Sequence, residues 1–347
     1  MDVKTNGNIS FWYADIGGIP DKRPALPGDR TADVCIIGAG YTGLWTAYYL
    51  KKANPSLDVV IVEREFAGFG ASGRNGGWLS GGFSWSREKY EKTSGRSAVV
   101  AMQNAMAGTV DEIERVTKLE GIDADLIRVD NLIAATNAAQ MERIRQEYQY
   151  ALDWQVSPER IQFLSAEQAS ARVRLANVQG AVSYRRMARV QPAKLVRGLA
   201  RVVEALGVSI FEGTTVTGFE KGRVDTDHGT VRAPVIIRAT EGFSAGLPGL
   251  ERTWLALNSA QIVTEPVPES LWREIGWEGH ELLGDAAHTY CYAQRTREGR
   301  ITMGGRGVPY RYGSKTDVNG QTQKATIDQL YGMLTRLLPQ TKSLKID

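Results

Sequence analysis

Residues 33–43 read DVCIIGAGYTG, and this stretch decides the fold. Its first five residues form a short apolar run that is typical of a buried parallel strand. The next six have the spacing G-x-G-x-x-G, and apolar residues then recur at helical intervals. Residues 58–62 (DVVIV) predict a second strand, which ends at Glu63. Strand, glycine turn, helix, strand and acid in this order predict a dinucleotide-binding βαβ unit, so the chain binds a dinucleotide or descends from a protein that did.

Each part of this unit has a mechanical role. Gly38 permits a tight turn, Gly40 lets the backbone approach a pyrophosphate, and Gly43 lets the helix pack closely on the strand. The N-terminus of the helix offers N–H groups and the positive end of its dipole to phosphates. Glu63 can accept hydrogen bonds from both hydroxyls of a ribose, but this residue alone does not separate NAD from FAD.

The composition is that of an ordinary globular protein with a small-molecule ligand. Hydrophobic residues make up 42% of the chain and charged residues 23%. A net charge of +3, from 42 basic and 39 acidic residues, is too small to indicate nucleic acid or a membrane surface. The longest apolar runs have the length of strands, so we expect no membrane span. The polar N-terminal region lacks the pattern of a signal peptide, and we expect a cytoplasmic protein whose oligomeric state stays open.

Cysteine and histidine are scarce. Cys35 lies in the first predicted strand and Cys291 lies far along the chain, which favours a reducing compartment and inert thiols over a disulfide framework. The chain has three histidines, His228, His280 and His288, at scattered positions. We therefore expect no metal site.

The pattern along the chain predicts an α/β protein with more than one domain, since 347 residues exceed the usual size of a single core. Residues 1–30 are expected to form an N-terminal arm on the surface. Short α/β units at 31–90 and 188–245 predict a discontinuous, Rossmann-like dinucleotide-binding domain. Residues 91–187 and 246–347 are then a second, α+β substrate domain built on a largely antiparallel sheet.

Periodicity and turn residues predict the individual elements outside the βαβ unit. Pro192 suits the first turn of a helix and Gly207 suits its C-cap. Helices are expected near 97–119, 139–153, 192–206 and 323–338. Strands are expected near 126–135, 208–211, 214–219, 230–238, 255–264, 289–294 and 301–305.

A second glycine-rich stretch, 68–77 (GFGASGRNGG), follows the ribose acid. A simple NAD dehydrogenase has no need of five glycines in ten residues at this place. A long cofactor that lies extended across the domain does need such a loop, which brings backbone amides close to its pyrophosphate and ring. The loop therefore favours FAD.

The two glycine motifs, with Glu63-Arg64 between them, resemble the D-amino-acid-oxidase-like family of FAD-dependent oxidoreductases. Within that family, which includes glycine and sarcosine oxidases, the chain is most similar to the bacterial γ-glutamylputrescine oxidase-like group. The resemblance continues through 191–195 (QPAKL), 212–214 (EGT), 239–240 (AT) and 299–305 (GRITMGG), and so covers nearly the whole chain.

The resemblance implies a noncovalently bound FAD, because no histidine stands in the 68–77 loop to make a covalent link. It places the pyrophosphate at the first glycine motif, the adenosine ribose at Glu63, and the adenine near Arg64 and the backbone of Val216. The second loop would run along the pyrophosphate toward the flavin ring, although Arg74 could equally be a surface charge. The implied cofactor-binding residues are Gly38, Gly40, Tyr41, Thr42, Gly43, Glu63, Arg64, Gly70, Ala71, Ser72, Arg74, Asn75, Gly76, Gly77, Val216, Ala239 and Thr240.

The resemblance also implies the chemistry, which the flavin performs while the protein positions the substrate. An amine carbon faces flavin N5, a hydride equivalent is transferred, and the imine is hydrolysed by water, with no dedicated side-chain base required. Trp78 follows the flavin loop, and His288, Tyr290 and Tyr292 alternate as on one face of a strand. These four residues are candidates for an aromatic wall that holds the amine, and ordinary sheet packing is the alternative for each.

The chain departs from the family at its end. Residues 343–347 (SLKID) look like the beginning of a strand, whereas relatives continue with a segment that returns to the flavin. We therefore expect this chain to lack that segment, to hold flavin weakly and to be inactive or nearly so. Three hypotheses stay open: an FAD-dependent oxidoreductase acting on a C–N bond of a small amine or amino acid, a non-catalytic or partner-dependent flavin-binding remnant, and an NAD(P)-dependent dehydrogenase.

Overall fold

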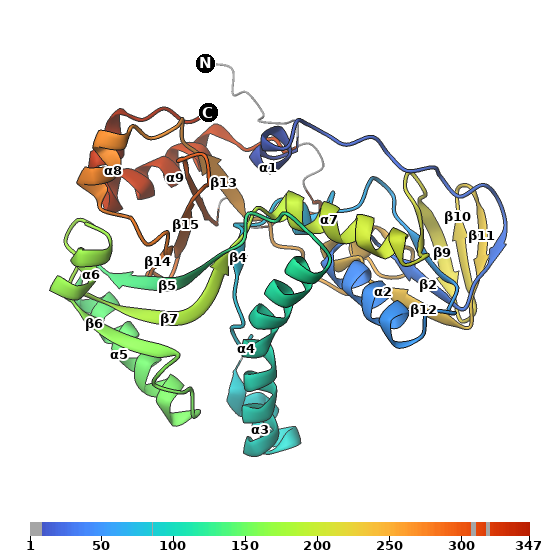
Figure 1. Ribbon diagram of the computed structural model, residues 1–347, viewed down its shortest axis with the longest axis horizontal. Helices are drawn as coiled ribbons and strands as arrows, with labels where there is room; N and C mark the ends of the chain where they lie inside the picture. Colours follow the sequence, from blue (N-terminus) through green and yellow to red (C-terminus); the bar gives the residue numbers. More distant parts are fainter. Residues whose placement is uncertain (1–8, 85, 307–309, 317–319) are drawn as a thin grey trace.

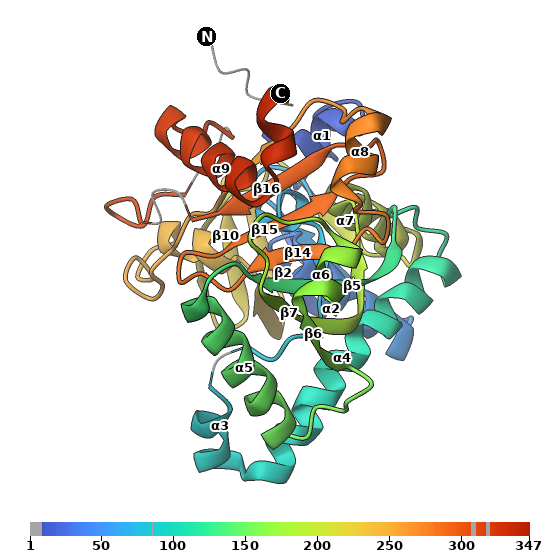
Figure 2. The ribbon, with the colours of Figure 1, turned by 90° about the vertical axis from the view of Figure 1, so that its left-hand side faces the viewer.

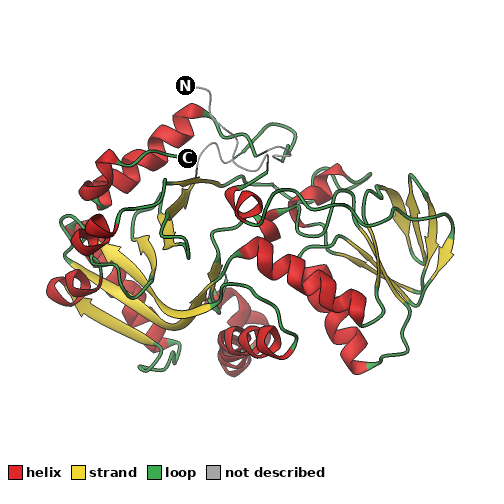
Figure 3. Ribbon diagram, turned by 45° about the horizontal axis from the view of Figure 1, so that its top comes forward, coloured by secondary structure: helices red, strands yellow, loops and turns green. Residues whose placement is uncertain are grey.

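The computed structural model describes residues 9–84, 86–306, 310–316 and 320–347. The described strands form three sheets, one of eight strands and two of four. Figures 1 and 3 show the large sheet in one half of the molecule and the two small sheets in the other. Helix α7 (Pro192–Ala205) lies between the two halves, and α4 (Arg96–Leu119) projects below them (Figure 1).

The predicted βαβ unit is present. Strand β2 (Val34–Ile37) leads through the glycine turn into α2 (Tyr41–Ala53), and β3 (Val59–Val62) pairs with β2 in parallel. Strands β12 (Val235–Arg238) and β8 (Ser209–Phe211) complete a parallel sheet in the order β12-β2-β3-β8. All residues of β2 and β3 are buried, as the apolar runs predict for a sheet covered on both faces.

The second small sheet has the order β1-β11-β10-β9. Its strands are β1 (Arg30–Thr31), β9 (Val216–Glu220), β10 (Arg223–Thr226) and β11 (Gly229–Arg232). The prediction of one strand over 230–238 is wrong, because β11 and β12 belong to different sheets. The break falls at Pro234, which has no N–H to donate to a ladder.

The large sheet has the order β13-β16-β15-β14-β5-β7-β4, with β6 on β7, and only its β14–β5 pair is parallel. This arrangement confirms the predicted fold class. Strands β6, β7 and β14 were not predicted, and the strands expected over 255–264 and 289–294 are shorter, as β13 and β15. The bounds are β4 (Trp78–Leu79), β5 (Ile127–Ala135), β6 (Ile161–Ser165), β7 (Gly180–Arg189), β13 (Ala260–Val263), β14 (Leu282–Asp285), β15 (Cys291–Arg295) and β16 (Ile301–Gly305).

The four long helices outside the βαβ unit lie where the sequence predicts them, as α4, α5 (Ala138–Asp153), α7 and α9 (Lys324–Leu337). Three shorter helices, α3 (Arg87–Ser94), α6 (Ala166–Arg172) and α8 (Glu269–Ile275), were not predicted. In the described ranges, no helix combines the length and apolar character that crossing a membrane requires.

The apolar core around the parallel sheet extends beyond the predicted domain boundary at residue 90. Val116, Ile122 and Ala124 pack in one cluster with residues of α2 and α7. The end of α4 and the loop after it therefore contribute to the core that we assigned to 31–90 and 188–245. Helix α9 instead packs in the core of the large sheet.

We expected residues 1–30 to form an arm on the surface, but the aromatic part of this segment is buried. Within it α1 (Phe11–Asp15) forms a short helix with Trp12 and Tyr13 buried. These side chains pack in a cluster with Phe66 and Phe69, next to the second glycine-rich loop. The aromatic run of the segment is part of the core, and residues 1–8 lie outside the described residues.

Candidate functional site

The first glycine motif forms a closely packed turn between β2 and α2. Gly38 has φ +106°, a conformation that favours glycine, and a Cβ there would lie 2.7 Å from the carbonyl oxygen of Ala239. A Cβ on Gly43 would lie 2.1 Å from the carbonyl oxygen of Gly38. The 239–240 segment at the end of β12 therefore lies against this turn, with the methyl group of Thr240 next to Gly38.

The N-terminus of α2 is suited to an anion. Its N-cap is Gly40, which offers no side-chain cap, and its first turn has no acidic residue. The hydroxyl oxygen of Ser72, from the second loop, accepts a hydrogen bond from Tyr41 N at 2.9 Å. A Cβ on Gly40 would lie 3.0 Å from that oxygen, so glycine here lets the second loop approach the helix end. Thr42, in the same turn, is exposed.

Glu63 lies directly beneath the glycine turn. Its carboxylate accepts hydrogen bonds from Ala39 N and Glu65 N, both at 2.9 Å. Burial raises the pKa of Glu63 above its ordinary value, although these two N–H donors oppose the shift. Thr214 N, two residues before Val216, donates to the carbonyl oxygen of Glu63 at 2.9 Å, so the start of β9 is brought near the acid.

The exposed Arg64 lies beside Glu63 in the chain. Its guanidinium stands 5.3 Å from the ring centroid of Phe243 and 3.5 Å from the Glu65 carboxylate. The side chain is thus held at the surface by an aromatic face and an acid.

The second glycine-rich loop has a defined shape. Residues Ala71–Gly73 form a single 3₁₀ turn, and the Asn75 side chain closes it by donating to the carbonyl oxygens of Ala71 and Ser72 at 3.2 and 3.1 Å. The same side chain accepts a hydrogen bond from Gly77 N at 2.9 Å. A loop with these internal bonds presents a preformed wall rather than a solvated turn.

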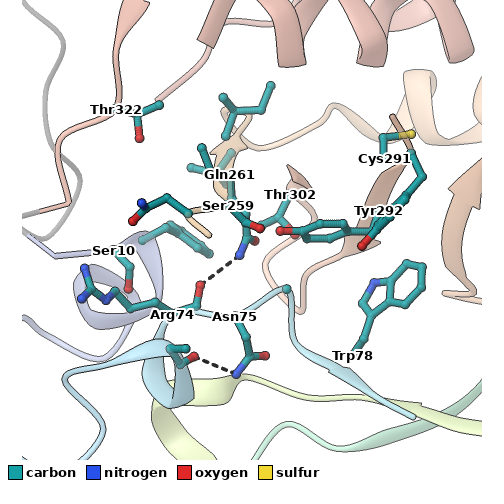
Figure 4. Close-up of a pocket in the computed structure, with 18 of the residues that line it drawn as sticks. Ser10, Arg74, Asn75, Trp78, Ser259, Gln261, Cys291, Tyr292, Thr302 and Thr322 are labelled. Carbon is teal, nitrogen blue, oxygen red and sulfur yellow. Dashed lines mark hydrogen bonds between the residues drawn. The ribbon is translucent and has the colours of Figure 1, made fainter. Parts of the chain in front are cut away.

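Segments far apart in sequence hold this loop in place. Tyr13 donates to the carbonyl oxygen of Gly68, and Trp12 donates through Nε1 to that of Asn75, both at 2.8 Å. From β13, Gln261 donates to the carbonyl oxygen of Arg74 at 2.9 Å, as Figure 4 shows.

A cavity of about 1470 Å³ opens on the second loop and reaches the large sheet. From the loop, its wall includes Ala71, Arg74, Asn75 and Gly76. Ser10, Trp12, Ser259 and Gln261 also line it, and our sequence reasoning missed all four. Ser10 and Trp12 belong to residues 1–30, which we had expected to form an arm on the surface.

Trp78 and Tyr292 form an aromatic wall of the cavity, with ring centroids 6.0 Å apart at 74° (Figure 4). Burial raises the pKa of Tyr292 to about 12, so its hydroxyl is neutral at physiological pH. Gly76 brings the loop against this wall, since a Cβ there would lie 2.8 Å from the Tyr292 ring. Tyr290 lines the cavity too, with 46% of its surface exposed.

The prediction that His288, Tyr290 and Tyr292 alternate on one strand is wrong, because only Tyr292 of the three lies in a strand. Strand β15 begins only at Cys291, so His288 and Tyr290 lie in the segment before it. His288 is exposed, contacts Arg143 at 3.3 Å and is not among the described residues that line the cavity. The aromatic wall therefore comprises Trp78, Tyr290 and Tyr292.

The remaining predicted cofactor residues lie outside this cavity. Among the described residues that line it are neither the glycines of the first motif nor Glu63. Direct protein contacts close that part, through Ala239 on Gly38 and Ser72 on Tyr41. The predicted positions thus form two adjoining groups, a packed turn at a helix end whose N-cap is a glycine, and a preformed loop that faces the cavity. Both groups fit a long cofactor with a pyrophosphate in its middle.

Carboxylates gather at one further place in the described part of the chain, where oxygens of Asp15, Asp125 and Glu298 lie within 4.8 Å of one another. Lys194 and Arg297 contact Asp125 at 3.0 and 2.7 Å and supply positive charge. The two cysteines are buried and free, and burial raises the pKa of the Cys35 thiol to about 12.

Comparison with known proteins agrees with this geometry. The model of the DAO family, described as FAD dependent oxidoreductase, matches residues 33–347. The chain is 28% identical to gamma-glutamylputrescine oxidoreductase of Escherichia coli, over 98% of this chain and 78% of that protein. It is 27% identical to the probable oxidoreductase OrdL of Rhizobium meliloti, over 85% and 68%.

Among solved structures, glycine oxidase from Geobacillus kaustophilus has the same fold, with a TM-score of 0.73 at 20% identity over 92% of this chain and 81% of that one. A family match over nearly the whole chain decides between the cofactors that Glu63 alone left open. The chain belongs to the DAO family of FAD-dependent oxidoreductases, and its cofactor is FAD.

Proposed function

We propose that this protein oxidises a C–N bond of a small amine or amino acid, with FAD as the electron acceptor. The observation that carries the proposal is the cavity, which has the loop at 70–77 as one wall and the aromatic pair Trp78 and Tyr292 as another. A flavin ring beside that loop would face a space large enough for a substrate. The names of similar proteins, gamma-glutamylputrescine oxidoreductase and glycine oxidase, support an amine or amino acid as the substrate.

We assign the cofactor contacts to the two groups of residues described above. Gly38, Gly40 and Gly43, with the backbone of Tyr41 and Thr42, would hold the pyrophosphate at the end of α2. Glu63 would bind the adenosine ribose, and Arg64 and Val216 would lie near the adenine. Ala239 and Thr240 would close the turn from behind. The second-loop residues that would lead to the flavin are Gly70, Ala71, Ser72, Arg74, Asn75, Gly76 and Gly77.

FAD, when bound, accepts a hydride equivalent from the amine carbon, and water hydrolyses the resulting imine. The side chains of the cavity then have to orient the amine and limit the access of water. Trp78 and Tyr292 present ring surface to the cavity, against which the carbon chain of the amine can pack. With a pKa of about 12, Tyr292 is not a base at neutral pH, and the proposed reaction requires none.

The test is to purify the protein, identify the cofactor released on denaturation, and mix the FAD-loaded form anaerobically with a panel of amines and amino acids. We expect bleaching of the flavin absorbance by at least one of them. Gly40→Val, which places a branched side chain against Ser72, serves as a control that should lose flavin. Stoichiometric FAD without bleaching by any amine would support the partner-dependent alternative, and bleaching by a nicotinamide alone would contradict amine oxidation.

A further inference from the structure

A second cavity, of about 510 Å³, lies between the first residues of β5 and the second half of β7. Figure 2 shows these strands, with β6, above α4 and α5. The volume falls in the range of roughly 300–1,000 Å³ that is usual for small-ligand sites. None of the residues that line this cavity is among the described residues that line the large one, and three of the six are arginines. They are Arg128, Val129, Asp130, Glu159, Arg185 and Arg186.

A β-bulge brings two consecutive arginines to this cavity. The register of β5 on β7 shifts between Val129 and Asn131. On β7, Arg185 and Arg186 together stand opposite the single residue Asp130. Successive side chains of a regular strand point to opposite faces of the sheet, yet both of these arginines line the same cavity. The bulge therefore accounts for the presence of both side chains at one place.

Arg186 has a backbone conformation that residues with a side chain rarely adopt. Its φ is +65°, and among the described residues it is the only non-glycine residue inside a strand whose φ is positive. Glycine is usual at such a position, because a Cβ strains it. Non-glycine residues in strained conformations concentrate at ligand sites, where the surrounding structure holds them. Here Arg185 N donates to the carbonyl oxygen of Arg160 at 2.9 Å, and the carbonyl oxygen of Arg186 accepts from Arg128 at 3.5 Å.

Neither Arg185 nor Arg186 has an acidic partner. Within the ranges that the structure describes, no carboxylate forms an ion pair with either side chain, and both residues are exposed. Each guanidinium group is a planar fork of N–H donors. The donors of two neighbouring forks are thus available to a ligand.

The protein itself compensates most of the other charges of this cavity. Arg172 lies 2.8 Å from Asp130 and neutralises it. The guanidinium of Arg128 contacts the carboxylate of Asp111, on α4. Glu159, the other acid of the lining, is exposed. Two arginines without an acidic partner therefore face one remaining acid, which leaves the cavity positive.

We propose that this cavity binds a phosphate group through Arg185 and Arg186, either as inorganic phosphate or as part of a small phosphorylated molecule. The guanidinium fork donates paired hydrogen bonds to phosphate oxygens. One fork fills a carboxylate, whereas a phosphate monoester has three free oxygens and up to two negative charges, so two arginines can share it. The bulge supplies such a pair, and the strained Arg186 is explained by the need to bring both forks to one anion.

The test is isothermal titration calorimetry at constant ionic strength on protein loaded with FAD, so that phosphate cannot occupy the end of α2. We expect inorganic phosphate and ribose 5-phosphate to bind saturably, and succinate, a dicarboxylate, to bind at least about tenfold more weakly. Tighter binding of the sugar phosphate would identify a phosphorylated small molecule as the ligand, and tighter binding of the free ion would identify phosphate itself. Equal affinity for succinate, or no binding of either phosphate, would overturn the proposal.

Two variants separate the phosphate site from the fold. Arg185→Gln and Arg186→Gly should each weaken phosphate binding about tenfold or more, because each removes charged hydrogen bonds to the anion. Arg186→Gly should not lower the Tm, since glycine suits the left-handed backbone at this position. Arg201→Gln, at an exposed arginine on α7, is the matched control and should bind phosphate like the parent. Unchanged phosphate affinity in both cavity variants, or an equal loss in Arg201→Gln, would overturn the site.

Discussion

Replacing Gly43 with alanine should both destabilise the protein and lower its FAD content, because this glycine sets the distance between α2 and the turn. The added Cβ would lie 2.1 Å from the carbonyl oxygen of Gly38 and 3.2 Å from Cγ2 of Ile36. Cβ atoms essentially never approach other heavy atoms closer than 3.0 Å, so helix and turn have to separate by 3.0 Å less 2.1 Å, which is 0.9 Å. The nearest atom belongs to the backbone and cannot rotate away.

Overpacking of this kind costs about 1–3 kcal/mol or more, and the rigid neighbour puts Gly43→Ala at about 3 kcal/mol. At roughly 2–4 °C per kcal/mol, we expect the Tm to fall by about 6–12 °C. Displacing the end of α2 also moves the backbone N–H groups that we assign to the pyrophosphate. The flavin absorbance per mole of purified protein should therefore fall as well.

The assay is differential scanning fluorimetry of both forms, together with the absorbance ratio of flavin to protein. Gly108→Ala is the matched control, because Gly108 lies in α4 with nothing within 4 Å of an added Cβ. That substitution should stabilise the protein by about 0.5–1 kcal/mol, as is usual when alanine replaces glycine inside a helix. If Gly43→Ala melts within about 1 °C of the parent and holds as much flavin, the close-packing argument is wrong.

Three further substitutions test other parts of the molecule. Burial raises the pKa of Glu63 above its unfolded value, so the free-energy cost of burying the ionised carboxylate is largest at high pH and disappears as the pH falls through the raised pKa toward 4.5. The Tm of the parent should therefore rise relative to that of Glu63→Gln between pH 7 and pH 5. A Tm difference that does not change with pH would contradict this reasoning. The carboxylate of Glu212 is fully buried and accepts a hydrogen bond from Arg23 at 2.8 Å. Glu212→Ala should therefore lower the free energy of unfolding by about 3–5 kcal/mol, measured by thermal unfolding, whereas Glu220→Ala, at an exposed position, should leave it almost unchanged. Because the pKa of Tyr292 is about 12, Tyr292→Phe should leave the shape of the kcat against pH profile unchanged between pH 7 and pH 10, and loss of a basic limb in that variant would show that its hydroxyl titrates during turnover.

The dinucleotide-binding unit could be predicted from the sequence because all its parts are local. The residues from the first strand to Glu63 span about thirty positions. The role of each one follows from its spacing to nearby residues and not from distant contacts. Fully apolar runs of strand length, glycines at fixed offsets and a helical period leave few alternatives. The family followed from the same local motifs.

Strand boundaries and partners in the large sheet could not be predicted in this way. His288 alternates with Tyr290 and Tyr292, but alternation does not say where a strand begins, and hydrogen bonds to β16 and β14 start β15 only at Cys291. Likewise, residues 230–238 look like one apolar strand in the sequence, but they form β11 and β12 of two different sheets, separated at Pro234.

Part of the candidate site could be predicted from local sequence, and part depends on the tertiary structure. Local sequence determined the glycine turn, the helix end and the acid below it, because backbone conformation and short-range spacing suffice to specify them. Only the tertiary structure decided which residues surround the substrate space. Trp12 reaches Asn75 across 63 positions of the chain, and Gln261 reaches Arg74 across 187. Contacts at such separations depend on how whole elements pack, and no local period of the sequence encodes them.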